Sequence, residues 1–174
     1  MDALCYMQIG SPIGPLFLVG NDKGLHEVWF VEGRQKKRPD AAWTHLNHQR
    51  KSGSCSALFA AKEQLGEYFA GNRESFDLPL VLNGTPFQLS VWRQLQTIPY
   101  GKTISYLELA QGIGNPKAVR AVGLANGSNP IPIIVPCHRV IGSDGSLTGF
   151  GGGLRTKQRL LALESGQLGF VEMS

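Results

Sequence analysis

Apolar residues in the first third of the chain fall into short runs separated by turn residues. Leu16–Val19 and Leu25–Val31 flank the turn sequence of residues 21–24, Asn-Asp-Lys-Gly, and this order predicts a β-hairpin. Residues 32–56 are polar and predict a loop. Within this stretch, the basic run of residues 34–39 is typical of a solvated loop, with a phosphate-binding or localisation patch as the alternative.

Between residues 57 and 70 the apolar spacing becomes that of a helix, and Gly71 is placed to end it. The apolar positions are Leu58, Ala61, Leu65 and Phe69. Residues 76–84 predict a connection. We therefore expect a small α/β domain at residues 1–84, followed by a second domain at residues 85–174.

Two capping sequences mark helix starts in the second domain. In Thr85-Pro86-Phe87-Gln88 and in Ser105-Tyr106-Leu107-Glu108, the first hydroxyl can accept a backbone N–H while the fourth side chain reaches back. Asn115-Pro116 is expected to open a further helix that runs to Ala125, separated from the preceding helix by residues 112–114. Two short helices joined in this way predict a helix-turn-helix.

The second helix of this pair is rich in Ala and Gly, and Arg120 is its one long charged projection. Small side chains would let its backbone approach a nucleic-acid groove closely. Tight packing against another helix explains the same composition and is the reading that small residues alone favour. The basic charge of this half reduces the difference between the two readings.

Residues 131–136, Ile-Pro-Ile-Ile-Val-Pro, cannot form a helix, because proline lacks a backbone donor and restricts its neighbour. We expect a stiff, extended segment that carries Cys137. The glycine-rich residues 142–153 can fold over a site, and residues 154–164 predict a last helix ending at Glu164. Its inward-facing residues are expected to be Leu154, Leu160, Leu161 and Leu163.

The composition, 42% hydrophobic and 17% charged, is typical of a soluble globular protein. No apolar run approaches the roughly 20 residues that span a bilayer, and the N-terminus does not resemble a signal peptide. An intracellular, reducing environment is therefore expected. Cys5, Cys55 and Cys137 are odd in number and widely spaced, which argues against a disulfide framework and predicts that each is a free thiol.

The net charge of +4 lies entirely in the second half of the chain. Residues 1–84 contain nine Lys/Arg and nine Asp/Glu, whereas residues 85–174 contain eight and four. This excess favours a polyanion such as nucleic acid as partner, although many basic domains bind none.

Cys137-His138 places an imidazole beside a thiol, the minimum for a nucleophilic cysteine, because the thiolate is the reactive species. Neighbouring side chains of an extended segment point to opposite sides, so a bridging water would be required. An inert, buried cysteine has the same local sequence. Taken alone, the dipeptide favours the inert, buried cysteine.

Longer stretches resemble the O6-alkylguanine-DNA alkyltransferase family, covering the whole C-terminal half in order and with similar spacings. Ser11–Leu16 and Gly24–Val28 also resemble the family's first domain. The matching stretches of the second half are Phe87 with Trp92, Ile98–Gly101, Tyr106, Gly114–Gly123, Asn126–Pro130, Pro136–Ile141 and Gly152 to Glu164. The resemblance implies a ribonuclease H-like α/β first domain and a mostly α second domain of winged helix-turn-helix type.

The resemblance further implies DNA repair by direct reversal. An alkyl group, methyl or larger, would pass irreversibly from O6 of guanine, and from O4 of thymine, to Cys137 in a single turnover. His138 would be the base acting through a water, Glu164 the carboxylate that orients the imidazole, and Asn129 a brace for the site.

Family resemblance also implies binding to the minor groove of duplex DNA, with the damaged nucleotide flipped out. Arg120 would fill the space it leaves, and Tyr106 would aid extrusion and contact the guanine. The remaining expected DNA-binding residues are Ala121, Gly123 and Ser128. The expected pocket residues are Pro132, Val140, Thr148, Phe150, Gly151 and Gly152. Some relatives carry serine in place of Gly151 and tyrosine in place of Phe150, which leaves the tolerance of bulky alkyl groups open.

No cofactor is expected. Some members of the family bind a structural zinc, but only Cys5 and His26 match its ligands, and a closed zinc site needs a full tetrahedral set. We expect a monomer without a membrane partner, located with DNA in the cytoplasm, or in the nucleus of a eukaryote.

Three other functions are consistent with parts of the pattern. A damage-binding module of the same fold would replace Cys137, usually by tryptophan. A helix-turn-helix transcription factor would share the basic half but has no use for a rigid Pro-Cys-His segment. A cysteine hydrolase would turn over repeatedly, so stoichiometry separates it from an alkyl acceptor.

Overall fold

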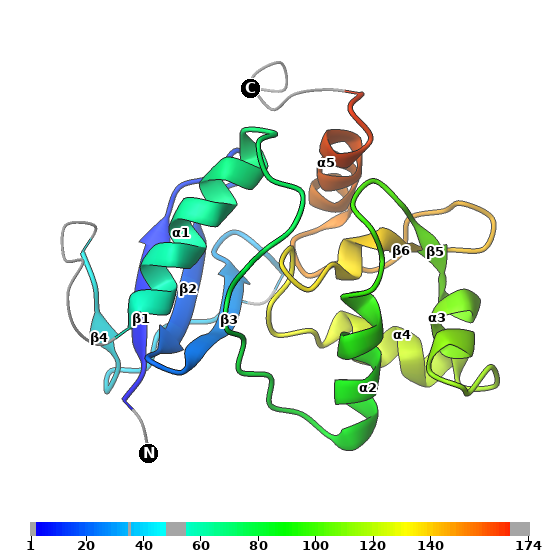
Figure 1. Cartoon of the computed structure of the whole chain (residues 1–174), viewed down its shortest axis with the longest axis horizontal. Helices are drawn as coiled ribbons and strands as arrows, with labels where there is room; N and C mark the ends of the chain where they lie inside the picture. The colour runs from blue at the N-terminus through cyan, green and yellow to red at the C-terminus, as the bar shows by residue number, and fades with distance from the viewer. Residues whose placement is uncertain (1–2, 35, 48–54, 168–174) are drawn as a thin grey trace.

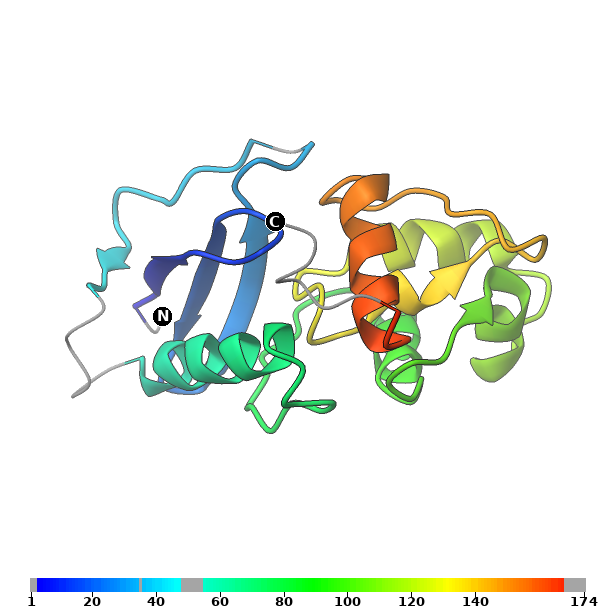
Figure 2. The same cartoon turned by 90° about the horizontal axis from the view of Figure 1, so that it is seen from above.

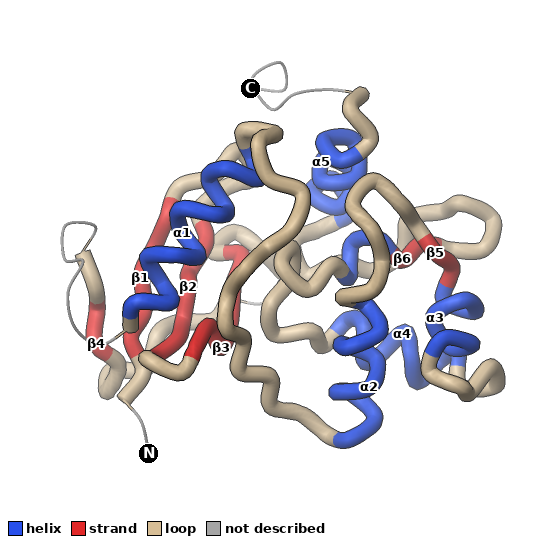
Figure 3. Tube along the Cα trace, viewed as in Figure 1, coloured by secondary structure: helices blue, strands red, loops and turns tan. Residues whose placement is uncertain are grey.

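Residues 3–34, 36–47 and 55–167 are described by the computed structural model. Figure 1 shows a sheet with one covering helix beside a cluster of helices, and Figure 2 shows the same two parts from above. Strands dominate the first part and helices the second, as Figure 3 shows by colour. The expected fold class, an α/β domain followed by a mostly helical domain, is confirmed.

The sheet contains β1 (Cys5–Ile9), β2 (Leu16–Asn21), β3 (Gly24–Phe30) and β4 (Thr44–His45), in the order β3-β2-β1-β4. β2 pairs antiparallel with both β1 and β3, and β4 pairs parallel with β1. The predicted hairpin is therefore present as β2 and β3. The rest of the polar stretch expected as a loop includes residues 48–54, which lie outside the described residues.

α1 (Ser56–Phe69) runs across one face of the sheet (Figure 2). Its extent matches the prediction within a residue. The side chains it buries are Ala57, Leu58, Ala61, Leu65, Tyr68 and Phe69. The helical spacing of apolar residues thus forms the face that packs on the sheet.

The expectation that every cysteine is a free thiol is wrong. Cys5, at the start of β1, and Cys55, the residue before α1, form a disulfide with a Cα–Cα distance of 6.3 Å. They are 50 residues apart in sequence, so their spacing carried no sign that they meet. Among the described cysteines, only Cys137 is free.

The helical part contains α2 (Pro86–Leu95), α3 (Tyr106–Gly112), α4 (Val119–Gly127) and α5 (Leu154–Glu164). The short strands β5 (Ile104–Ser105) and β6 (Val140–Ile141) pair in parallel. Both predicted capping boxes are present, at the starts of α2 and α3. Ser105 Oγ, for example, accepts the backbone N–H of Glu108 at 3.0 Å, while the Glu108 carboxylate accepts the N–H of Ser105 at 3.2 Å.

α4 begins later than the sequence predicted. Asn115 accepts a hydrogen bond from the N–H of Ala118 at 3.0 Å, which closes a turn, and the helix starts at Val119. Leu154 was expected to face inward but is 47% exposed, because it lies in the first turn of α5, where the helix leaves the core.

The expectation that Cys137 lies on an extended segment is wrong. Cys137 lies in a 3₁₀ turn, η1 (Cys137–Arg139). The segment before it also turns, because the N–H of Val135 bonds to the carbonyl of Ile131 at 2.9 Å and Ile133 has a φ of 75°. The prolines excluded an α-helix but still allowed these tight turns.

The two parts meet along β3. The N–H of Val28 donates to the carbonyl of Pro130 at 2.9 Å, and the rings of Phe30 and Phe150 are in edge contact at 5.4 Å between centroids. These contacts place β3 against the segments on either side of Cys137.

Candidate alkyl-acceptor site

Cys137 lies at a pocket of about 310 Å³ between the two parts of the molecule, which we call the acceptor pocket. Its side chain is buried, with 6% of the residue exposed. The helical part contributes Asn126 to Pro130, Pro132 and Gly149 to Gly151 to the walls, and the sheet part contributes Glu27 to Phe30 and Lys37. The pocket therefore depends on both domains, whereas every site residue predicted from the sequence lies in the second.

Asn129 holds the chain around Cys137. Its Nδ2 donates to the carbonyl of Val135 at 2.7 Å, and its Oδ1 accepts the N–H of Ile131 at 3.0 Å. The same side chain is hydrogen-bonded to the Cys137 thiol. Burial raises the pKa of this thiol to about 11, although the Asn129 hydrogen bond and the charge of Lys157 act in the opposite direction. At neutral pH the resting group is the thiol.

Behind Cys137, a buried chain of polar groups runs from His138 to the end of α5. His138 Nε2 is hydrogen-bonded to Glu164 Oε2, and Arg139 Nε donates to Glu164 Oε1 at 2.6 Å. The hydroxyl of Tyr68, from α1, donates to Glu164 Oε2 at 3.2 Å. The carboxylate is thus held from three sides.

These contacts set the protonation of the pair. Burial lowers the pKa of His138 below its ordinary 6.5, which keeps the imidazole neutral. Burial alone would raise the pKa of Glu164, but the hydrogen bonds with His138 and Arg139 and the charge of Arg139 outweigh it and lower the pKa. An ionised Glu164 fixes the proton of His138 on Nε2. The other nitrogen, Nδ1, has no hydrogen-bond partner within the described part of the chain and can accept a proton.

Lys157 is a residue of this site that the sequence analysis did not select. It is fully buried, and its Nζ donates to the carbonyls of Val140 at 2.6 Å and Thr148 at 2.9 Å. It therefore ties the strand after Cys137 to the loop that covers the pocket. Its spacing from Leu160 and Glu164 on α5 places it on the buried face of that helix, and this was the available signal.

A second hollow, a groove of about 560 Å³, lies beside α3 and α4. Tyr106 and Arg120 line it, and Thr148 Oγ1 donates to the hydroxyl of Tyr106 at 3.1 Å. The groove and the acceptor pocket share residues Gly127, Gly149, Phe150 and Gly151. They are therefore adjoining parts of one recess.

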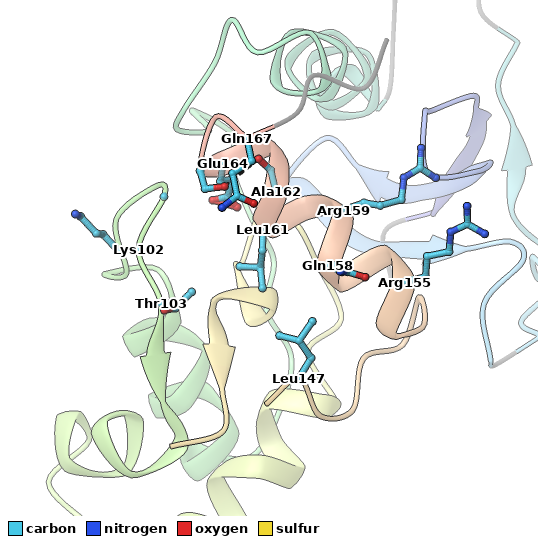
Figure 4. Close-up of a pocket in the computed structure, with 12 residues that line it drawn as sticks. Lys102, Thr103, Leu147, Arg155, Gln158, Arg159, Leu161, Ala162, Glu164 and Gln167 are labelled. Carbon is cyan, nitrogen blue, oxygen red and sulfur yellow. Dashed lines mark hydrogen bonds between the residues drawn. The ribbon is translucent and has the colours of Figure 1, made fainter. Parts of the chain in front are cut away.

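A third hollow of about 510 Å³ lies between α5 and the turn around Gly101 (Figure 4). Its basic residues do not converge, because Arg155 and Arg159 extend away from Lys102. The Cys137 side chain does not line it. Because the free thiol of Cys137 lines the acceptor pocket, the candidate site lies there.

Comparison with known proteins assigns the chain to a protein family. Residues 86–166 match the model of the 6-O-methylguanine DNA methyltransferase DNA-binding domain, and residues 4–82 match that of its ribonuclease-like domain. The chain belongs to this family. Curated relatives named methylated-DNA–protein-cysteine methyltransferase include one from Methanosarcina barkeri, 50% identical over 94% of this chain and 98% of its own. Another, from Mycolicibacterium paratuberculosis, is 54% identical over 91% of each chain.

Solved structures of the family have the same fold. The Mycobacterium tuberculosis OGT in complex with DNA superposes with a TM-score of 0.82, at 49% identity over 93% of each chain. The O6-methylguanine-DNA methyltransferase of Pyrococcus kodakaraensis, at 18% identity, has a TM-score of 0.51 and supports the fold alone.

For this member of the methyltransferase family, the structure brings most predicted site residues together. Cys137, His138, Glu164 and Asn129 form one cluster. The predicted residues that line the acceptor pocket are Ser128, Pro132, Phe150 and Gly151. The predicted residues that line the groove are Tyr106, Arg120, Gly123 and Thr148, together with Phe150 and Gly151. Ala121 is exposed on α4, near Arg120.

Three predicted pocket residues do not line the acceptor pocket: Thr148 lines the groove instead, and Val140 and Gly152 line neither hollow. Val140 is fully buried and its carbonyl accepts from Lys157. Gly152 packs under Phe30, where an added Cβ would be 3.0 Å from the ring. Neither lines the acceptor pocket, because both face the supporting layer of the structure.

Within the described residues, no group of three or more His, Cys, Asp and Glu side chains could hold a metal ion. Cys5, one of the two residues that matched family zinc ligands, is bonded to Cys55 and does not present a thiolate. No helix of the described ranges has the length and apolar character needed to cross a membrane.

Proposed function

We propose that this protein repairs DNA by moving a methyl or other alkyl group from O6 of guanine to Cys137, once per molecule. The observation that carries the proposal is a free thiol at a two-domain pocket, backed by the buried His138–Glu164 pair, in a chain of the methyltransferase family. The same chemistry extends to O4 of thymine.

In the proposed reaction, Cys137 Sγ attacks the alkyl carbon, so that an S–C bond forms as the C–O6 bond breaks. The thiol proton passes through a water to Nδ1 of His138 and returns to the guanine that leaves. Glu164 orients the imidazole and stabilises its charged form. Asn129 holds the sulfur, and the Gly151 N–H stabilises the developing charge on O6. Atoms and electrons balance without a cofactor, and the product thioether ends the reaction.

The substrate in this proposal is duplex DNA bound through its minor groove. An alkyl carbon within a base stack cannot be approached in line by a thiol, so the nucleotide is flipped into the acceptor pocket. Arg120 fills the space that it leaves, and Tyr106 assists extrusion and contacts the base. Ala121 and Gly123 let the backbone of α4 approach the DNA, and Ser128 contacts it at the mouth of the pocket.

The proposal also assigns the boundary between the two domains. The sheet domain comprises residues 1–84 and the DNA-binding domain residues 85–174, and the family matches at 4–82 and 86–166 support this boundary. We expect the protein to act as a monomer in the cytoplasm, or in the nucleus of a eukaryote, wherever its DNA substrate is present.

The decisive experiment is a mass measurement after incubation with duplex DNA that contains O6-methylguanine. We expect the intact mass to rise by one methyl group and no further, and peptide analysis to place the methyl on Cys137. The Cys137→Ser variant should stay unmodified. An unmodified wild-type protein, or a methyl on another residue, contradicts the proposal. Release of the methyl with repeated turnover would indicate a hydrolase.

A further inference from the structure

The basic run at residues 34–39 is not a detached surface loop. The N–H of Arg34 donates to the carbonyl of Gly151, in the loop that covers the acceptor pocket, at 3.2 Å. The preceding residue is Gly33, where an added Cβ would lie 2.9 Å from the same carbonyl oxygen. Close backbone approach therefore fixes Arg34 against the second domain. Figure 2 shows the segment after β3 beside the loop before α5.

Arg34 lines the DNA-facing groove together with Arg120 of α4. Among the described residues that line the groove, these two are the charged ones and none is acidic. Its floor continues into the acceptor pocket through the shared residues Gly127 and Gly149 to Gly151. A nucleotide whose base enters the acceptor pocket from this groove has its phosphate in the groove, which Arg34 lines from the sheet domain.

Other cations of the run are placed differently. Lys37 is paired with Glu27 at 3.4 Å and lies over the ring of Trp29, at 5.3 Å from its centroid. Lys36 and Arg38 are exposed and line neither the groove nor the acceptor pocket. Among the described cations of this run, Arg34 is the one whose side chain reaches the groove.

We propose that Arg34, in the sheet domain, binds a backbone phosphate of the flipped nucleotide and holds it while the base lies in the acceptor pocket. The inference rests on the proposed function and assigns a DNA contact to the domain that the sequence analysis had left without one. A guanidinium is suited to this role because its planar N–H groups bind two phosphate oxygens at once.

The test compares Arg34→Ala with the matched variant Lys36→Ala, which removes the same charge from the same loop. Methyl transfer is measured with subsaturating O6-methylguanine duplex, and benzyl transfer with free O6-benzylguanine, which has no phosphate. We expect Arg34→Ala to slow the duplex reaction about 5- to 30-fold and to leave the free-base reaction unchanged. Lys36→Ala should stay within about 2-fold of wild type on both substrates.

Salt dependence provides an independent readout. The slope of log affinity for duplex against log salt concentration should fall by about 1 in Arg34→Ala, while Arg34→Lys should keep the slope and recover part of the rate. Equal duplex rates for the Arg34→Ala and Lys36→Ala variants overturn the inference, as does an equal loss on both substrates in Arg34→Ala. If wild-type protein is not alkylated on Cys137, the proposed function has failed instead.

Discussion

Cys137 is a buried thiol whose surroundings oppose its ionisation more than they assist it. Desolvation raises its pKa to about 11, and the Asn129 hydrogen bond and the Lys157 charge only limit that rise. Such a thiol is protected from casual oxidation and modification, since the thiolate is the reactive species. Reaction therefore depends on a neighbouring group that removes the proton as the S–C bond forms.

Replacing Lys157 by Met, which has a similar length and no charge, tests the role of the buried cation as a positioning residue. We expect alkylation by free O6-benzylguanine to slow about 10-fold or more near neutrality, because negative charge develops on the sulfur as the proton leaves and the buried cation that stabilises it is gone. The pH profile of Cys137 reaction with a small alkylating agent should move to higher pH, since the stabilising charge is gone.

The control is Arg155→Ala, an exposed residue on the same helix. It should leave both the rate and the pH profile unchanged. A Lys157→Met protein that is slower but has an unchanged pH profile would show that Lys157 supports the loop without acting on the thiol.

The lowered pKa of His138 leads to a prediction of how the reaction rate depends on pH. Burial places its pKa below 6.5, so the imidazole is a neutral base at neutral pH and becomes protonated only in more acidic solution. The rate with O6-benzylguanine should be flat between about pH 6.5 and 8 and fall as the pH drops through the folded pKa. Stability should fall in the same range, because the unfolded chain takes up the proton more readily.

Rate constants measured across this range in overlapping buffers provide the check. His138→Gln should lose the acid limb together with most of the rate. A rate that increases tenfold per pH unit from pH 6 to 9 would mean that pre-formed thiolate reacts without the histidine.

Among the secondary-structure elements, α4 carries Arg120 and the η1 turn carries Cys137, and the two elements are in contact. α4 presents Arg120 and Ala121 to solvent and buries Val122, Ala125 and Asn126. Asn126 Nδ2 donates to the carbonyl of Cys137 at 3.4 Å, so the buried side of α4 touches the turn that carries the sulfur. The helix that the proposed function places against DNA is thereby packed on its other side against the turn that carries Cys137.

Arg120→Ala should separate base flipping from chemistry. Without the side chain that fills the vacated stack, methyl transfer from duplex DNA should slow about 10- to 100-fold, since flipping costs a few kcal/mol. Reaction with free O6-benzylguanine should change little. Arg93→Ala, which removes an exposed charge from α2, is the matched control. Equal losses on both substrates would rule out a flipping role for Arg120.

At the scale of the whole molecule, the site lies at the interface between the two domains. Tyr68 of α1 donates to Glu164, Phe30 of β3 packs on Phe150, and Val28 bonds to Pro130. The sheet domain thus holds the carboxylate behind His138 and closes one wall of the acceptor pocket. A group added to the sulfur would therefore enter a pocket whose walls belong to both domains.

Alkylation of Cys137 should destabilise the protein. The added group breaks the hydrogen bond with Asn129 and crowds a buried position, at a cost of about 1–3 kcal/mol. For a chain of this size, each kcal/mol lowers the melting temperature by roughly 2–4 °C. Thermal unfolding of unmodified, methylated and benzylated protein measures the effect, and the benzyl adduct should lose most. An equal or higher melting temperature after alkylation would contradict this expectation.

Local sequence was sufficient for most elements. The β2–β3 hairpin, the extents of α1 and α5, and both capping boxes were predicted correctly, because turn residues, apolar spacing and hydroxyl caps act within a few residues. Cys137, His138 and Glu164 were selected through the family resemblance, and the structure brings them together. Their separate chemistry alone did not distinguish a reactive thiol from an inert one.

Tertiary structure decided what depends on long-range contact. Sequence spacing could not show that Cys5 meets Cys55 or that Arg34 reaches Gly151. Helical spacing places Lys157 on the buried face of α5, but it could not show that the Lys157 ammonium binds the carbonyls of Val140 and Thr148. The 3₁₀ turn at Cys137 was also missed, because proline excludes an α-helix without specifying which turn replaces it. The proposed acceptor, Cys137, was thus selected from the sequence through its family resemblance, whereas the pocket walls and the charges around the thiol arise from the packing of two domains.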